Sequence, residues 1–251
     1  VSVNQGASWQ TVESQLPPII TLASDQVRKR LFAGSLDSIF ISADGGRNWS
    51  TASEFPDNAE PYHLSFDDEL GGLIRLGPSA EALISKDGGK TFEKLKLKFP
   101  TRSSAAAGFQ LYTHPCWRGH KFLLEVGGPL YRSIDQGKTW QKMTLPVTSK
   151  RGAYQSRELA FDPTRRHWLL LSTVEGVFAS NDNGFSWFSL GGGLEVRDQS
   201  EQVVWIGPDG KIQAAGAKTC NIYLLNPVAN KEFISGNIYF ASGSDKIEKR
   251  L

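Results

Sequence analysis

The stretch Ser133-Ile134-Asp135-Gln136-Gly137-Lys138-Thr139-Trp140 decides the fold of this 251-residue chain, because its pattern returns four more times. The other copies are Ser2–Trp9, Ser42–Trp49, Ser85–Phe92 and Ser180–Trp187. Every copy, here called a box, reads S-x-[DN]-x-G-x-[TSN]-[WF]. Chance composition does not keep one register through five copies, so the chain is a repeat protein.

Each box is predicted to be the turn of a β-hairpin, because short apolar runs such as Ser38–Ser42 precede it and an alternating stretch follows it. An Asp or Asn in such a turn accepts hydrogen bonds from main-chain N–H groups, and Gly supplies the positive φ. The aromatic residue that ends the box is expected to wedge into a neighbouring layer. The polar residues are Asn4, Asp44, Asp87, Asp135 and Asp182, and the aromatic residues are Trp9, Trp49, Phe92, Trp140 and Trp187.

The box Asp residues are interpreted as structural, because one Asp per repeat held by its own backbone does not make a metal site or a catalytic pair. Successive Asp or Asn positions lie 40, 43, 48 and 47 residues apart, which suits a four-stranded blade. Two further strands are predicted between boxes, for example His63–Phe66 with Leu73–Leu76 and Phe109–Thr113 with Lys121–Val126. We expect almost no helix.

The predicted fold is therefore all-β, a single domain over residues 1–251 that forms a β-propeller of four-stranded antiparallel blades. Three strands near Val203–Ile206, Lys211–Ala215 and Ile222–Leu225 form a blade whose box has decayed. The last two predicted strands, within 238–251, would pair with the N-terminal box hairpin and close the ring in one blade. This count favours six blades and leaves five or seven open.

The box resembles the Asp-box, or BNR repeat, of sialidase-like, sortilin-type and photosystem II assembly-factor propellers. In sialidase-like propellers the boxes lie on the face away from the active site, so the resemblance implies a binding site at the second-to-third turns and the connections between blades. It also favours an extracytoplasmic compartment, secreted or periplasmic. The chain begins at Val1, which we interpret as a processed mature chain or a piece of a longer one.

Composition restricts the partners. The 28 basic and 26 acidic residues give a formal charge of +2, so neither nucleic acid nor an anionic membrane is an expected partner. No apolar run approaches the roughly 20 residues of a membrane-spanning helix. We expect a monomer without cofactor or metal that binds a protein or a carbohydrate.

Three smaller features remain. Glu93–Phe99 alternates lysines with apolar residues, as in a charged outermost strand; a basic binding strip is the alternative. His114, Cys116 and His120 lie close together but supply too few ligands for a typical zinc site, so we expect a surface turn. Cys116 and Cys220 fall in turns on opposite faces and are predicted not to form a disulfide.

The candidate binding site is a group of arginines in the blade connections. It comprises Arg102, Arg151, Arg157 and Arg197, with Tyr154 and Glu158 beside them. Converging arginines suit a carboxylate, a phosphate or an acidic protein patch. The sequence thus predicts a non-catalytic binding or assembly module, and the alternative is a sialidase-like glycoside hydrolase in which Tyr154 and Glu158 would act. The arginine-and-proline motif of sialidases is missing.

Overall fold

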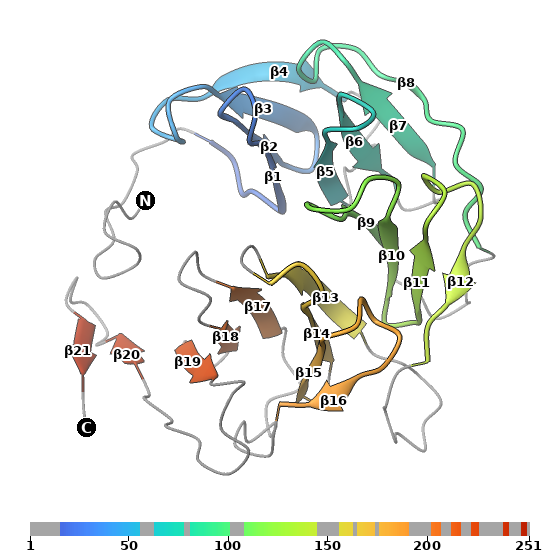
Figure 1. Cartoon of the computed structure of the whole chain (residues 1–251). Helices are drawn as coiled ribbons and strands as arrows, with labels where there is room; N and C mark the ends of the chain where they lie inside the picture. The colour runs from blue at the N-terminus through green and yellow to red at the C-terminus, as the bar shows by residue number, and fades with distance from the viewer. Residues whose placement is uncertain are drawn as a thin grey trace. The chain divides into compact units, whose positions relative to one another are not determined.

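The computed structural model describes residues 16–55, 63–77, 81–100, 108–144, 156–162, 165–173, 176–190, 202–206, 212–216, 222–225, 238–240 and 247–249. Every regular element in these ranges is a β-strand, β1 to β21, as predicted (Figure 1). No helix in them is long and apolar enough to cross a membrane. The N-terminal box, with Asn4 and Trp9, lies outside the described residues.

Four sheets have the predicted blade topology, in which four consecutive strands pair as antiparallel neighbours. Blade 1 comprises β1 (Thr21–Asp25), β2 (Arg30–Gly34), β3 (Ser38–Ser42) and β4 (Ser50–Glu54). Blade 2 comprises β5 (His63–Asp67), β6 (Gly72–Leu76), β7 (Ala82–Ser85) and β8 (Glu93–Lys94). Blade 3 comprises β9 (Gly108–Thr113), β10 (Lys121–Val126), β11 (Leu130–Ser133) and β12 (Gln141–Lys142). Blade 4 comprises β13 (Ser156–Phe161), β14 (Leu169–Thr173), β15 (Gly176–Ser180) and β16 (Phe188–Ser189).

The fifth sheet contains β17 (Gln202–Ile206), β18 (Ile212–Gly216), β19 (Ile222–Leu225), β20 (Ile238–Phe240) and β21 (Ile247–Lys249), in that order. Its first three strands are those predicted for the blade with the decayed box. β20 joins β19 only through the pair Ile222 and Ile238. The proposed pairing of β20 and β21 with the N-terminal hairpin involves residues outside the described ranges, so ring closure and the blade count stay predictions.

The chain divides into two compact units, one within residues 10–125 and 131–141 and the other within 126–130 and 142–251. In the first unit, blades 1 and 2 bury Phe32, Ile39, Leu64 and Leu73 between them. A larger apolar cluster joins blades 2 and 3 through residues such as Ile74, Leu111 and Leu123. In the second unit, Leu170, Val177, Ala179 and Leu190 form a core against which Ile206 of β17 packs. Stacking of neighbouring sheets thus supplies the cores, as in other repeat folds.

Candidate functional site

Each described box is a turn held together by its own Ser and Asp. In the third box, the Ser85 hydroxyl donates to Asp87 Oδ1 at 2.8 Å and accepts from the Gly89 N–H at 2.7 Å. Asp87 Oδ1 also accepts from the N–H groups of Lys90 and Thr91, and Oδ2 accepts from the Thr91 hydroxyl at 2.6 Å. The same Ser-to-Asp and Gly-to-Ser bonds recur at Ser42, Ser133 and Ser180.

The fourth position of the box, directly after the Asp, adopts positive φ even where it is not Gly. Gly45 and Gly88 occupy it in two boxes, but Gln136 has φ 66° and Asn183 has φ 60°. Side chains other than Gly tolerate this region poorly, Asn better than most. The Gly that follows is left-handed in all four described boxes, at Gly46, Gly89, Gly137 and Gly184.

Hydrogen bonds hold the box carboxylates in the charged form. The Thr139 hydroxyl and its N–H, with the Ser133 hydroxyl, lower the pKa of Asp135 from 3.8 to about 2. The N–H and side chain of Asn48 lower the pKa of Asp44, and Thr91 does the same for Asp87. A group whose pKa is depressed in the folded state stabilises the fold above its unfolded pKa, and this contribution disappears as pH falls through the folded pKa.

We therefore expect the melting temperature to fall as the pH drops from 3.8 towards about 2, the two pKa values of Asp135. Melting curves recorded by circular dichroism across this window measure the effect. Asp135→Asn should melt lower at neutral pH and show a shallower decline in acid. Parallel curves for the variant and the parent would refute a contribution from this carboxylate.

The box tryptophans differ in whether the indole N–H has a hydrogen-bond partner. Trp49 donates to the Gly46 carbonyl at 2.9 Å, and Trp187 donates to the Gly184 carbonyl at 3.0 Å. The Trp140 N–H is buried and has no partner in the described chain. Trp140 instead packs on the cluster between blades 2 and 3, with its ring 6.4 Å from that of Phe99.

A second set of turn caps, at the end of the first strand of each blade, was missed in the sequence. Asp25 Oδ1 accepts from the Arg28 N–H at 2.9 Å, and Asp162 Oδ1 accepts from the Arg165 N–H at 3.0 Å. Asp67 Oδ1 accepts from two N–H groups of its own turn, those of Glu69 and Leu70. These residues, with His114 at the same place in blade 3, are called the first-turn caps. A signal was present, since they recur at spacings of 42, 47 and 48 residues.

His114 explains the compact His–Cys–His turn. Its Nδ1 accepts from the N–H groups of Cys116 at 3.0 Å and Trp117 at 3.2 Å. The nitrogen lone pair that zinc would need is therefore used by the backbone, and His114 is buried. Cys116 is an exposed free thiol, and Cys220 lies outside the described residues.

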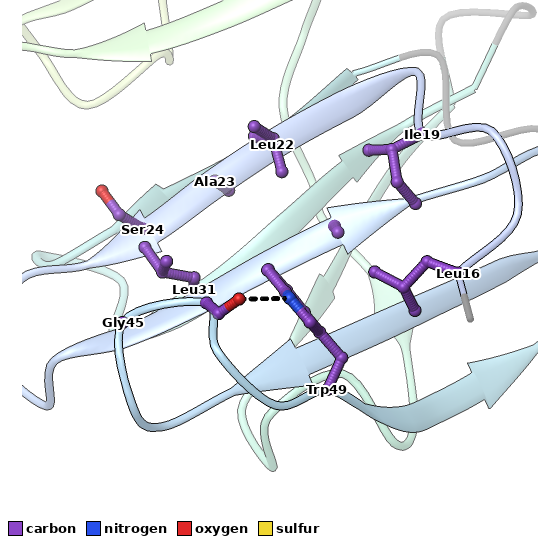
Figure 2. Close-up of a pocket in the computed structure, with 10 residues that line it drawn as sticks. Leu16, Ile19, Leu22, Ala23, Ser24, Leu31, Gly45 and Trp49 are labelled. Carbon is purple, nitrogen blue, oxygen red and sulfur yellow. Dashed lines mark hydrogen bonds between the residues drawn. The ribbon is translucent and has the colours of Figure 1, made fainter. Parts of the chain in front are cut away.

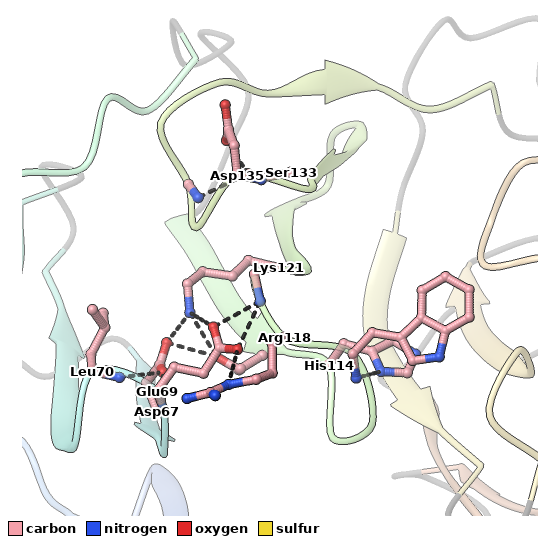
Figure 3. A network of polar contacts seen from close by, with 12 residues as sticks. Asp67, Glu69, Leu70, His114, Arg118, Lys121, Ser133 and Asp135 are labelled. Atoms are coloured by element: carbon pink, nitrogen blue, oxygen red, sulfur yellow. Dashed lines mark hydrogen bonds and ion pairs between the residues drawn. The ribbon is translucent and has the colours of Figure 1, made fainter.

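One first-turn cap also binds the next blade through buried charges (Figure 3). The ammonium group of Lys121 at the start of β10 pairs with Asp67 Oδ2, and both side chains are fully buried. Asp67 Oδ2 accepts from the Thr113 hydroxyl at 2.9 Å as well. Glu69 adds hydrogen bonds from the Gly119 N–H at 2.7 and 2.9 Å. Asp67, Glu69, Thr113 and Lys121, called the buried ion cluster, thus connect blades 2 and 3.

Within a blade, the box turn and the first turn lie at the same end of the strands. The Gln136 N–H donates to the Gly119 carbonyl in blade 3, and the Asn183 N–H donates to the His167 carbonyl in blade 4. The blade connections and second-to-third turns consequently lie at the opposite end, where the candidate arginine site was placed.

Most of that candidate site falls outside the described residues, namely Arg102, Arg151, Tyr154 and Arg197. Arg157 and Glu158 belong to β13, at the end away from the box. Ser156 pairs with Thr173 and Glu158 pairs with Ser172, so the backbone of Arg157 forms a β-bulge. Bulges occur often next to functional sites, where they redirect a side chain.

The open face of blade 1 carries an apolar groove of about 460 Å³ (Figure 2). Leu16, Ile19, Leu22 and Trp49 line it, and Leu22 is 67% exposed. In blade 2 the residues at the corresponding strand positions, among them Leu64 and Leu73, are buried against blade 1. The groove is therefore a blade face of the kind that elsewhere packs on a preceding sheet.

Solved structures with the same fold have little sequence identity to this chain. The structure "YCF48 bound to D1 peptide" is 17% identical with a TM-score of 0.56, over 94% of this chain and 71% of that one. An ancestral GH74 enzyme is 17% identical with a TM-score of 0.63, over 95% of this chain but only 36% of the enzyme. The WD40 β-propeller domain of Doa1 is 12% identical with a TM-score of 0.50, over 82% of this chain and 64% of that one. These similarities confirm the predicted β-propeller fold and leave the activity open.

No curated protein sequence matches the chain significantly. The family model described as sortilin, neurotensin receptor 3, matches residues 80–228. The match covers more than half of the chain, including three boxes and the buried ion cluster's Lys121. The predicted likeness to sortilin-type propellers is thereby confirmed, and the chain belongs to the Sortilin-Vps10 family.

Proposed function

We propose that this propeller is a non-catalytic binding or assembly module that presents the blade-connection face to an acidic protein or glycan partner. The observation that carries the proposal is the β-bulge at Arg157, on the strand end away from the boxes. A bulge at that end suits a residue that contacts a ligand. Arg102, Arg151 and Arg197 are proposed to contribute from neighbouring blade connections, with Tyr154 and Glu158 beside them.

The chemistry of the described turns supports binding over catalysis. The carboxylates of the boxes and first-turn caps accept hydrogen bonds from their own turns. A glycosidase needs two carboxyl groups that flank a substrate bond and are free to transfer protons or attack. A peptide is the ligand named for the YCF48 structure, and a peptide or protein ligand is accordingly our first candidate here.

A glycoside hydrolase is the second candidate, and Asp68 is the observation that favours it. Partial removal from water, together with the charges of Asp25 and Asp67, raises the pKa of the Asp68 carboxyl, as a general acid requires. However, Asp67 is committed to the buried ion cluster. Asp67 is therefore not free to act as the nucleophile or base that Asp68 would need as its partner.

Reversing Arg151 and Arg157 to Glu should weaken association with an acidic partner and leave the melting temperature unchanged. The attraction should also decline with salt, because exposed charges are screened beyond about 8 Å at physiological ionic strength. Partners captured on the immobilised parent from an extract of the source cells, and then purified, provide the ligand for titrations of parent and variant. Equal affinity of both proteins across a salt series would refute the arginine site.

A panel of fluorogenic glycosides distinguishes the two candidate functions. We expect no turnover by the parent protein. Turnover that Asp68→Asn or Glu158→Gln abolishes, with the fold intact by circular dichroism, would replace the binding function with the hydrolase.

A further inference from the structure

The segment that follows β8 on the outer edge of blade 2 is held in place by its apolar residues. The Leu95 N–H donates to the Ala82 carbonyl at 2.9 Å, which extends the pairing of β8 with β7 by one residue. The Leu97 N–H then donates to the Leu95 carbonyl, so the chain turns at Lys96. The predicted long outermost strand is therefore wrong in extent, because β8 contains only Glu93 and Lys94.

The predicted alternation of side chains nevertheless holds along this segment. Leu95, Leu97 and Phe99 pack on the cluster between blades 2 and 3, and the Phe99 ring stacks on that of Phe109 with centroids 5.8 Å apart. Leu97 reaches the box of blade 3, since a Cβ built on Gly137 would lie 2.9 Å from Leu97 Cδ2. The backbone that carries the lysines is thus anchored by packing.

Three lysines are sequence neighbours of the two residues that meet at this anchor, Leu97 and Gly137. Lys96 and Lys98 flank Leu97, Lys138 follows Gly137, and all three side chains are exposed. Within the described residues no carboxylate lies within 4.0 Å of their ammonium groups, whereas Lys94 is paired with Glu81 at 3.0 Å. Asp135, the carboxylate in the box of Lys138, accepts hydrogen bonds from Ser133 and Thr139, and the three lysines outnumber its single negative charge. Lys96, Lys98 and Lys138, called the lysine patch, form a local positive field on a nearly neutral chain.

The adjacent edge strand indicates what kind of anion fits. β8 is the last strand in the order β5-β6-β7-β8, so one side of its main chain has no neighbouring strand within the described sheet. An extended peptide can pair with such an edge, while a sulfated glycan has no comparable ladder of amides. Because β8 contains only two residues, the main-chain pairing available to a peptide is short, and the charges beside the edge must contribute much of the binding.

We propose that the outer edge of blade 2 binds an extended acidic peptide, which pairs with β8 and places its carboxylates on the lysine patch. Alternate side chains of a strand lie roughly 7 Å apart on one face, so a segment with an acid at every second residue matches best. The proposal rests on the binding role proposed above but uses a different surface from the arginine site. Failure at one surface therefore leaves the other testable.

The test uses the full chain and a fluorescein-labelled peptide of alternating Glu and Thr, with binding followed by fluorescence anisotropy. The triple variant Lys96→Glu, Lys98→Glu, Lys138→Glu should bind at least about tenfold more weakly than the parent, because three attractions become repulsions. A matched triple variant with the same change in net charge, Lys29→Glu, Arg47→Glu, Arg166→Glu, should keep most of the affinity, because these exposed residues belong to blades 1 and 4. Reversal of Arg151 and Arg157 should have a similarly small effect.

Two further probes separate the alternatives. Methylation of alternate peptide nitrogens should weaken binding, since it removes the donors that would pair with β8. Equal weakening by both triple variants would overturn the proposal in favour of nonspecific charge attraction. Undiminished binding of the methylated peptide, or binding of dextran sulfate but not of the peptide, would also overturn it.

Discussion

Replacement of Asp67 by Ala should lower the free energy of unfolding by about 3 to 5 kcal/mol, since it leaves the Lys121 ammonium buried without its counter-charge. Both side chains are fully buried and join β5 to β10 across two blades. The remaining acidic neighbour, Glu69 Oε2, is 3.9 Å from Lys121 Nζ and already accepts from Gly119. Chemical denaturation, monitored by Trp fluorescence, measures the loss.

An exposed ion pair provides the control for this prediction. Glu81→Ala removes the partner of Lys94, whose side chain is 81% exposed, and should cost less than about 1 kcal/mol. The double variant Asp67→Leu, Lys121→Met should recover part of the stability, because it removes both buried charges but leaves the N–H groups of Glu69 and Leu70 without their cap. If Asp67→Ala costs no more than Glu81→Ala, the buried ion cluster does not stabilise the fold as described.

Trp140→Ala should be nearly as damaging, with a loss of about 3 kcal/mol, because removal of a large ring from a packed cluster leaves a cavity. The ring lies between blades 2 and 3 with Phe99, and a Cβ on Gly137 would come within 3.3 Å of it. Unfolding midpoints in denaturant and by heat give the cost.

Phe substitutions separate ring packing from the indole N–H. Trp140→Phe should cost less than Trp49→Phe, since the Trp140 N–H has no partner in the described chain and that of Trp49 binds the Gly46 carbonyl. If Trp140→Ala unfolds at the parent's midpoint, the ring does not act as a wedge.

The fold was predictable because strand periodicity and turn chemistry are local properties of the sequence. β10 at Lys121–Val126 and β19 at Ile222–Leu225 coincide with their predicted ranges, and β3 coincides with the apolar run before its box. The predicted outermost strand at Glu93–Phe99 was too long, because a turn at Lys96 follows β8. Alternation predicts which side chains face inward, but it does not determine how long a strand stays paired.

The buried charges could not be predicted, because they depend on which blades touch. Lys121 follows His120 at the end of a polar turn, and only the neighbouring Asp67, 54 residues away, explains its burial. The first-turn caps were hidden for another reason, since His114 replaces Asp in blade 3 and interrupts the repeat. The candidate arginine site was inferred from connections that lie mostly outside the described residues, and only the backbone at Arg157 and Glu158 bears on it.

The self-contained boxes affect how such a chain can change by duplication. In the four described boxes, the hydrogen bonds that the Ser and Asp side chains donate or accept all join residues no more than four apart, so a copied blade brings a complete turn with it. A copied blade does not bring the pairing of Asp67 with Lys121 with it, because the two residues belong to successive blades. Insertion of a new blade between them would separate the two charges. We therefore expect insertion of a blade to be tolerated less well between blades 2 and 3 than between other neighbouring blades.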